Sequence, residues 1–260
     1  SGDSQSDAQQ GRASIEEYGS ERGDQVPLIF QRGEQCSASF YYQIFFLSVF
    51  PIQEYYGVKK KSMILTPKIE KAITRSAELH RHQERKGNGA PYIVHPYAVA
   101  FLLAHYTNDE DVICAGLLHD ILEDVPSYGA ERMQVEFGER VYRIVKEVTE
   151  DRDPTGGWSL LPKKNHWRER KERYIENLKN DSEEALLIAC ADKIQNLRSL
   201  VDAYALRGDA LLAHFRAGKE EMLWFYETVF QVISERFHHP LVHELRRSLD
   251  EAKKRVFLTV

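Results

Sequence analysis

Residues 116–124 read GLLHDILED, an apolar stretch that carries two polar pairs, His119-Asp120 and Glu123-Asp124. In a helix, each member of the second pair lies one turn beyond a member of the first, so the four polar groups share one side and the apolar residues point toward a core. Burying these charges costs several kcal/mol unless something compensates them. A bound metal ion would do so, and histidine beside aspartate suits a borderline or hard divalent ion such as Mn²⁺.

A plainer interpretation of His119-Asp120 is a hydrogen-bonded structural pair, and a metal site needs further ligands from elsewhere in the chain. His95 stands at the start of an expected helix, and Asp192 ends the apolar run LLIACA. A carboxylate buried there must be ligated or paired. A salt bridge to a buried Lys or Arg is therefore the alternative role for Asp192.

The composition limits the class of protein. The chain has 260 residues, of which 42% are apolar, enough for one core of roughly 150 to 200 residues or at most two small ones. Its net charge of -5 argues against a sequence-independent nucleic-acid-binding protein, which needs a broad basic field. The three cysteines lack CxxC spacing and suit a reducing cytoplasm, and the longest apolar run, residues 40–50, is about half of a membrane span. We expect a cytoplasmic protein without a membrane or nucleic-acid polymer as partner.

The composition changes near residue 63. The polar, small residues that dominate residues 1–37 cannot offset the entropy of ordering. We expect residues 1–62 to form an N-terminal extension, mostly disordered or non-native, ahead of a folded domain over residues 63–260, whose last helices complete the bundle or form a subunit contact. From Thr66 onward, apolar residues recur three and four apart, which predicts an all-α helical bundle without strands. The expected helices are residues 67–84, 96–107, 109–123, 130–150, 167–180, 182–206, 208–235 with a break near Gly218, and 240–257.

Two helix starts carry clear signals. Thr66 is a suitable cap and Pro67 a suitable first-turn residue. Asn108, followed by three acidic residues, is expected to cap the helix that leads into GLLHDILED, because acidic groups suit the positive end of a helix dipole.

Four separated motifs occur in one order: RKGNGAPYIVHP at residues 85–96, AGLLHDILEDV at 115–125, FGERVYRIVKEVTE at 137–150 and ACADKIQNLRSL at 189–200. The set resembles the HD phosphohydrolase superfamily. It is most similar to the hydrolase domain of the RelA/SpoT homologue family, especially its single-domain members, the small alarmone hydrolases. The resemblance covers about residues 67–206 and implies an HD-domain helical bundle.

The resemblance also implies a metal-dependent active site. Glu123 and Asp124 match the acidic pair that orients and activates the attacking water, and either could transfer its proton. The site would hold one Mn²⁺ per chain, which would lower the pKa of a bound water and screen the phosphate oxygens. The ligands carried over from the family are His95, His119, Asp120 and Asp192.

Substrate contacts follow from the resemblance and from charge. Arg85 and Lys86 match an Arg-Lys pair close to substrate and metal, Asn196 matches a contact near the ribose, and Tyr92, Lys193 and Arg198 are weaker matches. Lys193 could equally be a structural ion-pair partner. The basic stretch of residues 162–174 is typical of a solvated amphipathic helix. Its alternative role is to reach distant phosphates through Lys163, Lys164 and Arg170.

Three functions remain open. The first is a Mn²⁺-dependent pyrophosphohydrolase that removes the 3′-diphosphate from (p)ppGpp and leaves GDP or GTP and pyrophosphate. The second keeps the chemistry but changes the substrate to adenosine alarmones or to the 2′-phosphate of NADPH. The third is a catalytically silent nucleotide-binding module, against which the complete ligand set argues. The partner is a small-molecule nucleotide in each case, and homo-oligomerisation is open.

Overall fold

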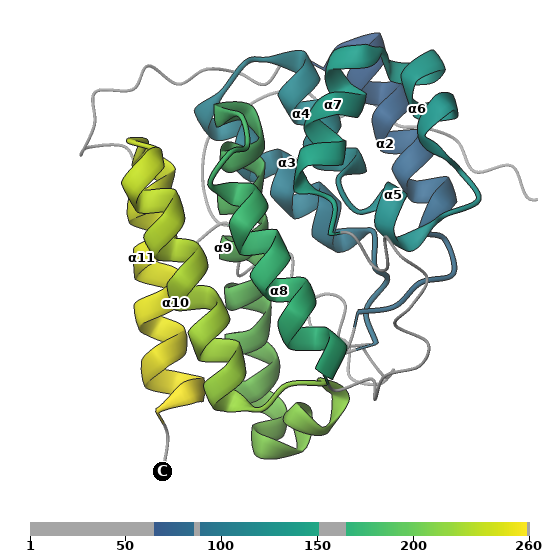
Figure 1. Ribbon diagram of the computed structural model, residues 1–260. Helices are drawn as coiled ribbons and strands as arrows, with labels where there is room; N and C mark the ends of the chain where they lie inside the picture. The colour runs from purple at the N-terminus through teal and green to yellow at the C-terminus, as the bar shows by residue number, and fades with distance from the viewer. Residues whose placement is uncertain (1–64, 86–88, 151–164, 259–260) are drawn as a thin grey trace, which may run out of the picture. The chain divides into compact units, whose positions relative to one another are not determined.

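The computed structural model describes residues 65–85, 89–150 and 165–258, which lie within one unit, Val58–Val260. Within these three ranges the β structure is limited to an isolated bridge between Glu84 and Pro91. The prediction of an all-α bundle is therefore confirmed (Figure 1). The expected extension of residues 1–62 lies outside the described residues. No described helix has the length and apolar character that a bilayer crossing requires.

In chain order the helices are α2 (Pro67–Leu79), α3 (Val94–Tyr106), α4 (Glu110–Leu118), α5 (Ile121–Asp124), α6 (Ala130–Phe137), α7 (Glu139–Val148), α8 (Asn165–Leu178), α9 (Glu183–Arg207), α10 (Lys219–Arg236) and α11 (Pro240–Ala252). The central helix is α9, which packs against α3, α4, α7, α10 and α11. Its run LLIACA is buried, as expected of a helix that is apolar on every side. The two polar residues that follow this run directly, Asp192 and Lys193, are buried as well.

Helices α3 and α4 approach each other closely at Gly116. A Cβ atom at Gly116 would lie 2.3 Å from Cδ1 of Leu103, far inside ordinary contact distance. A larger residue at position 116 would therefore require the Leu103 side chain or α3 to move. The close approach brings the residues at the start of α3 near those at the end of α4.

The prediction of a single helix over residues 109–123 is wrong, because this segment forms two helices, α4 and α5. His119 and Asp120 form a turn between α4 and α5, with Asp120 at φ -90° and ψ -6°. The cap is also one residue later than predicted: Asp109, not Asn108, accepts a hydrogen bond from the backbone N–H of Asp111 at 3.0 Å. The turn projects His119 and Asp120 away from the axis of α4.

Other helix boundaries also differ from the prediction. Gly138, at φ +90°, divides the expected helix over residues 130–150 into α6 and α7. The segment Gly208–His214 is a 3₁₀ helix, and α10 begins after Gly218, where the break was predicted. The first helix ends at Leu79, and the chain then turns to pair Glu84 with Pro91.

The other boundaries lie close to those predicted. Thr66 caps α2, as predicted, by accepting from the N–H of Ile69 at 3.2 Å. The α-helical part of the last helix ends at Ala252 and continues as a π-helical turn, Lys253–Phe257.

Candidate metal and nucleotide site

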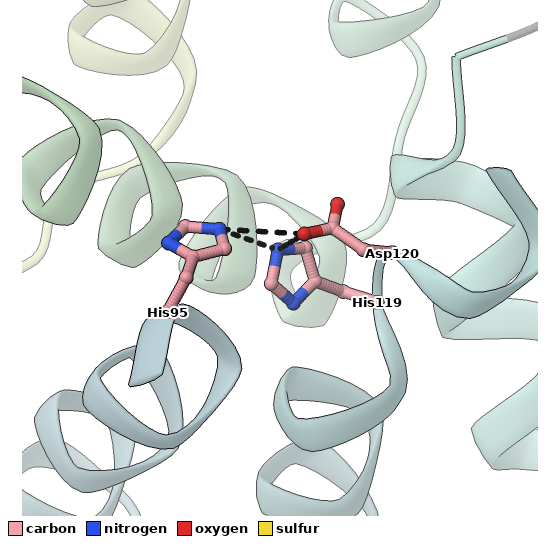
Figure 2. Close-up of side chains that lie close together, drawn as sticks. All are labelled: His95, His119 and Asp120. Carbon is pink, nitrogen blue, oxygen red and sulfur yellow. Dashed lines mark hydrogen bonds and ion pairs between the residues drawn. The ribbon is translucent and has the colours of Figure 1, made fainter. Parts of the chain in front are cut away.

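Four polar side chains from distant parts of the chain converge between α3, the α4–α5 turn and α9. Nε2 of His95 lies 3.4 Å from Oδ2 of Asp120 and 3.1 Å from Oδ1 of Asp192. Nε2 of His119 lies 3.2 Å from Oδ2 of Asp120 and 3.9 Å from Oδ1 of Asp192. Figure 2 shows the rings of His95 and His119 turned toward each other, with the Asp120 carboxylate beside them. One ligand atom each of His95, His119 and Asp120 lies within 4.8 Å of the other two, and Asp192 faces this group through its contacts with both histidines.

The local hydrogen bonds aim His119 at this point. Its Nδ1 lies 2.8 Å from the carbonyl oxygen of Gly116, which can only accept, so Nδ1 carries the proton and Nε2 faces the cluster. The two Nε2 atoms of His95 and His119 lie 3.2 Å apart, a separation at which a shared proton or a cation must lie between them or beside them. This donor set fits a divalent ion that accepts both imidazole and carboxylate.

The electrostatics of the cluster favour positive charge. Burial alone would lower the pKa of His119, but the carboxylate of Asp120 outweighs it and raises that pKa to about 9. Burial alone would raise the pKa of Asp120, but the charge and hydrogen bond of His119 hold it well below its usual range. A cluster that retains a proton so firmly is also suited to a metal ion, which can replace that proton.

Asp192 forms the ion pair that its sequence context offered as an alternative role, and it still turns one oxygen toward the histidines. Its Oδ2 pairs with Nζ of Lys193 at 2.5 Å, while Oδ1 faces the histidines and accepts from Nδ2 of Asn196 at 2.5 Å. Burial alone would raise the pKa of Asp192, but the positive charge of Lys193 outweighs it and holds that pKa well below its usual range. The ion pair keeps the carboxylate ionised and leaves one oxygen directed at the cluster.

The cluster forms part of the wall of a cavity of about 550 Å³, here called the main cavity, which is within the usual range for small-molecule sites. Six carboxylates but three Lys or Arg side chains line it among the described residues. An anionic nucleotide would be repelled by this wall, so a bound divalent cation would favour its entry. The apolar part of the wall is supplied by residues such as Tyr174, Phe215, Met222 and Tyr226.

Both predicted catalytic acids, Glu123 and Asp124, line the main cavity, although the helix that was expected to align them with His119 and Asp120 is broken. They also border a neighbouring side cavity of about 660 Å³. Arg170, one of the three basic residues predicted to reach distant phosphates, lines this side cavity. The other two, Lys163 and Lys164, lie outside the described residues, as does Lys86.

Of the other predicted substrate contacts, Arg85, Tyr92, Lys193 and Asn196 line the main cavity. Tyr92 donates a hydrogen bond from Oη to Oδ2 of Asp120 at 2.6 Å, so it also orients that carboxylate. Arg198 differs from the prediction. It is not among the described residues that line either cavity, and its guanidinium donates to buried Glu244 on α11 at 2.8 Å. Its role in the described structure is to join α9 to α11.

The sequence analysis missed several residues of the site. Lys171 lines both cavities and pairs with Glu150, although its neighbour Arg170 was the predicted residue. Burial lowers the pKa of Lys171 despite the opposing charge of Glu150. Gln195, which contacts both His95 and Arg85, carried no signal in the sequence. Tyr226, also missed, borders both cavities from α10, and burial raises its pKa to about 12.

The comparison with known families agrees with this architecture. A family model described as an HD domain matches residues 72–220, more than half of the chain. This chain belongs to the HD domain family. The His119-Asp120 pair at the α4–α5 turn lies within the matched range, together with His95 and Asp192.

The chain is similar to proteins named guanosine-3′,5′-bis(diphosphate) 3′-pyrophosphohydrolase MESH1. The Mus musculus protein is 39% identical over 128 residues, covering 48% of this chain and 65% of that protein. The Xenopus tropicalis protein is 39% identical over 135 residues, covering 51% and 69%. The chain thus spans about two thirds of the length of these relatives.

A solved structure also resembles this chain. It is described as a metazoan ortholog of SpoT that hydrolyses ppGpp, and it matches with a TM-score of 0.56 and 29% identity, covering 74% of this chain and 97% of that one. The resemblance to SpoT-like hydrolase domains is therefore confirmed.

Proposed function

We propose that this protein is a Mn²⁺-dependent pyrophosphohydrolase that removes the 3′-diphosphate of (p)ppGpp, leaving GDP or GTP and pyrophosphate. The observation that carries the proposal is the convergence of His95, His119, Asp120 and Asp192 at distances of 3.1–3.9 Å between their facing nitrogen and oxygen atoms. The activity named for the MESH1 relatives supports the substrate. The buried thiols Cys114 and Cys190 support a reducing, cytoplasmic location.

In the proposed reaction these four residues hold one divalent ion. When bound, such an ion lowers the pKa of a water and screens the charge of the phosphate oxygens. Glu123 or Asp124 takes a proton from the attacking water, whose oxygen forms the new bond to phosphorus. The bond between that phosphorus and the ribose 3′-oxygen breaks, and the leaving oxygen receives the proton that the carboxylate took from the water. A positioned carboxylate contributes a factor of about 10² to 10⁴ in such a step.

The cations of the main cavity have distinct tasks in this proposal. Arg85, whose planar guanidinium can grip two phosphate oxygens, holds the diphosphate near the metal cluster. Lys171, at the junction of the two cavities, attracts phosphates on the far side of the nucleotide. Lys193 forms an ion pair with Asp192, so in this proposal it stabilises that carboxylate and does not bind the phosphates.

The test is a substrate panel with Mn²⁺, in which (p)ppGpp, its adenosine counterparts and NADPH are incubated with the protein and the products are separated by chromatography. We expect pyrophosphate and GDP or GTP from the guanosine compounds. Activity on the adenosine compounds or on NADPH alone would overturn the assigned substrate. Absence of turnover on every compound would favour a silent binding module.

Two variants separate metal binding from catalysis. Asp192→Ala should lose the metal, as measured by mass spectrometry of the bound ion. Glu123→Gln should keep the metal and lose turnover by about 10² to 10⁴. Glu131→Gln, an exposed acid on α6, is the matched control and should retain both. Full turnover by Glu123→Gln would show that this side chain has no role in proton transfer.

A further inference from the structure

Gln195 lies on α9 between the residues already assigned to the site and contacts two of its members through one atom. Its Oε1 is 2.5 Å from Nδ1 of His95 and 3.1 Å from Nη2 of Arg85. Its Nε2 donates to Oγ of Ser199 at 2.9 Å. The side-chain amide of Gln195 is half-buried and makes these three hydrogen bonds with described residues.

These contacts determine where the protons are. A guanidinium can only donate, so the atom of Gln195 that faces Arg85 must be the carbonyl oxygen. The same oxygen faces Nδ1 of His95, so Nδ1 must be the donor and carry the proton. Nε2 of His95 then presents its lone pair toward Asp120 and Asp192. No other tautomer of neutral His95 satisfies both contacts.

The two histidines are thereby held by different acceptors. His119 donates from Nδ1 to the carbonyl of Gly116, which is backbone and part of α4. His95 donates to a side chain that is also bound to Arg85, a residue that faces the main cavity. A matching amide on the adjacent residue, Asn196, accepts from the same Nη2 at 3.2 Å and donates to Asp192.

We propose that Gln195 is a positioning residue that holds His95 in the Nδ1–H tautomer, directs Nε2 of His95 to a divalent cation, and connects this histidine to Arg85. The identity of the cation rests on the proposed function, but the tautomer does not. Groups that orient a metal-binding histidine in this way typically affect metal affinity by about 10- to 100-fold when they are removed.

Two variants test the role of Gln195. Gln195→Met keeps the length of the side chain but removes the acceptor, and Gln195→Glu keeps an acceptor in the same place. Gln231→Met is the matched control, because Gln231 is exposed on α10 and its side chain bonds, among the described residues, to Glu235 of the same helix. Circular dichroism and thermal unfolding verify that each variant is folded.

The first measurement is the tautomer of His95, read by long-range ¹H–¹⁵N NMR in metal-free protein at a pH where its imidazole is neutral. We expect the Nδ1–H form alone in the wild type, in Gln195→Glu and in the control, and a mixture in Gln195→Met. An Nε2–H form of His95 in the wild type would overturn the proposal without any variant.

The second measurement is Mn²⁺ affinity by electron paramagnetic resonance. Gln195→Met should weaken binding by about 10- to 100-fold, and Gln195→Glu should restore it. Unchanged tautomer and affinity in Gln195→Met would overturn the positioning role even if the protein hydrolyses (p)ppGpp. Conversely, a tautomer change in a protein that binds no Mn²⁺ would support the hydrogen-bonding role of Gln195 and overturn the metal site of the proposed function.

Discussion

Gly116→Ala tests whether the close approach of α3 and α4 sets the spacing of the two histidines. The new Cβ would lie 2.3 Å from Cδ1 of Leu103, whereas carbon atoms in contact prefer about 3.5 to 4.0 Å. The buried Leu103 side chain, or α3 itself, must therefore retreat by about 1 Å or more. Overpacking of this kind costs about 1 to 3 kcal/mol, and the better helix propensity of alanine returns about 1 kcal/mol. We expect a net loss of up to about 2 kcal/mol in the free energy of unfolding.

The same displacement should reach the metal cluster. His95 lies in the first turn of α3, and Nδ1 of His119 is hydrogen-bonded to the carbonyl of Gly116, so we expect separation of the helices to move the two Nε2 atoms apart. Metal bonds tolerate deviations of about 0.2 Å, and we expect Mn²⁺ affinity to fall at least about tenfold. The assays are urea unfolding and Mn²⁺ titration.

Two further variants serve as controls for Gly116→Ala. Leu103→Val in the same chain removes the clashing carbon and should recover part of both losses. Gly218→Ala, where a Cβ meets nothing within 4 Å, should leave the affinity unchanged. Wild-type stability and affinity in Gly116→Ala would refute the reasoning.

Two other predictions concern stability away from the cluster. Burial and the charge of Glu147 raise the pKa of Asp181 to about 6, so its ionised form destabilises the fold above that pH, and this destabilising contribution of Asp181 should disappear as the pH falls from 7 toward 4. Asp181→Asn should therefore raise the free energy of unfolding in urea by about 1 kcal/mol at pH 8, allowing for solvent screening, and leave it unchanged near pH 4. An equal gain at both pH values would contradict this cause. Glu244→Ala leaves Tyr106 and Arg198 without their carboxylate and should cost about 2 kcal/mol, with Mn²⁺ affinity unchanged by calorimetry. A loss of Mn²⁺ affinity in this variant would indicate that Arg198 contributes to the site after all.

That these polar side chains are buried could be predicted because they interrupt apolar runs. Asp192 after LLIACA, and His119-Asp120 within GLLHDILED, are buried by their neighbours whatever the detailed packing. Buried charge without compensation is costly, so each of them was expected to have a metal ion or an ion-pair partner. The order of the four motifs, through the family resemblance, then identified His95 as a further member of the site.

The turn at His119 and Asp120 could not be predicted from periodicity. The apolar spacing continues through both residues, and two residues in a turn disturb it too little to be seen. Lys171 was missed for a related reason: α8 has a weak apolar pattern, and adjacent residues on a helix point about 100° apart. The sequence of α8 therefore did not indicate whether Arg170 or Lys171 faces the main cavity.

Gln195 was not predictable because its role depends on partners about one hundred residues away. Its contacts with His95 and Arg85 exist because α3 and the segment before it pack against α9. A glutamine in a partly exposed helix position usually contacts solvent, so the residue type gave no signal. Tertiary packing decided this part of the site.

The central claim is that one divalent ion binds between four side chains, and anomalous X-ray diffraction at the manganese edge, on crystals grown with Mn²⁺, tests it most directly. We predict a single peak roughly 2.0 to 2.3 Å from Nε2 of His95, Nε2 of His119 and one carboxylate oxygen each of Asp120 and Asp192. A peak at another position, or none at a Mn²⁺ concentration that supports turnover, would contradict the claim.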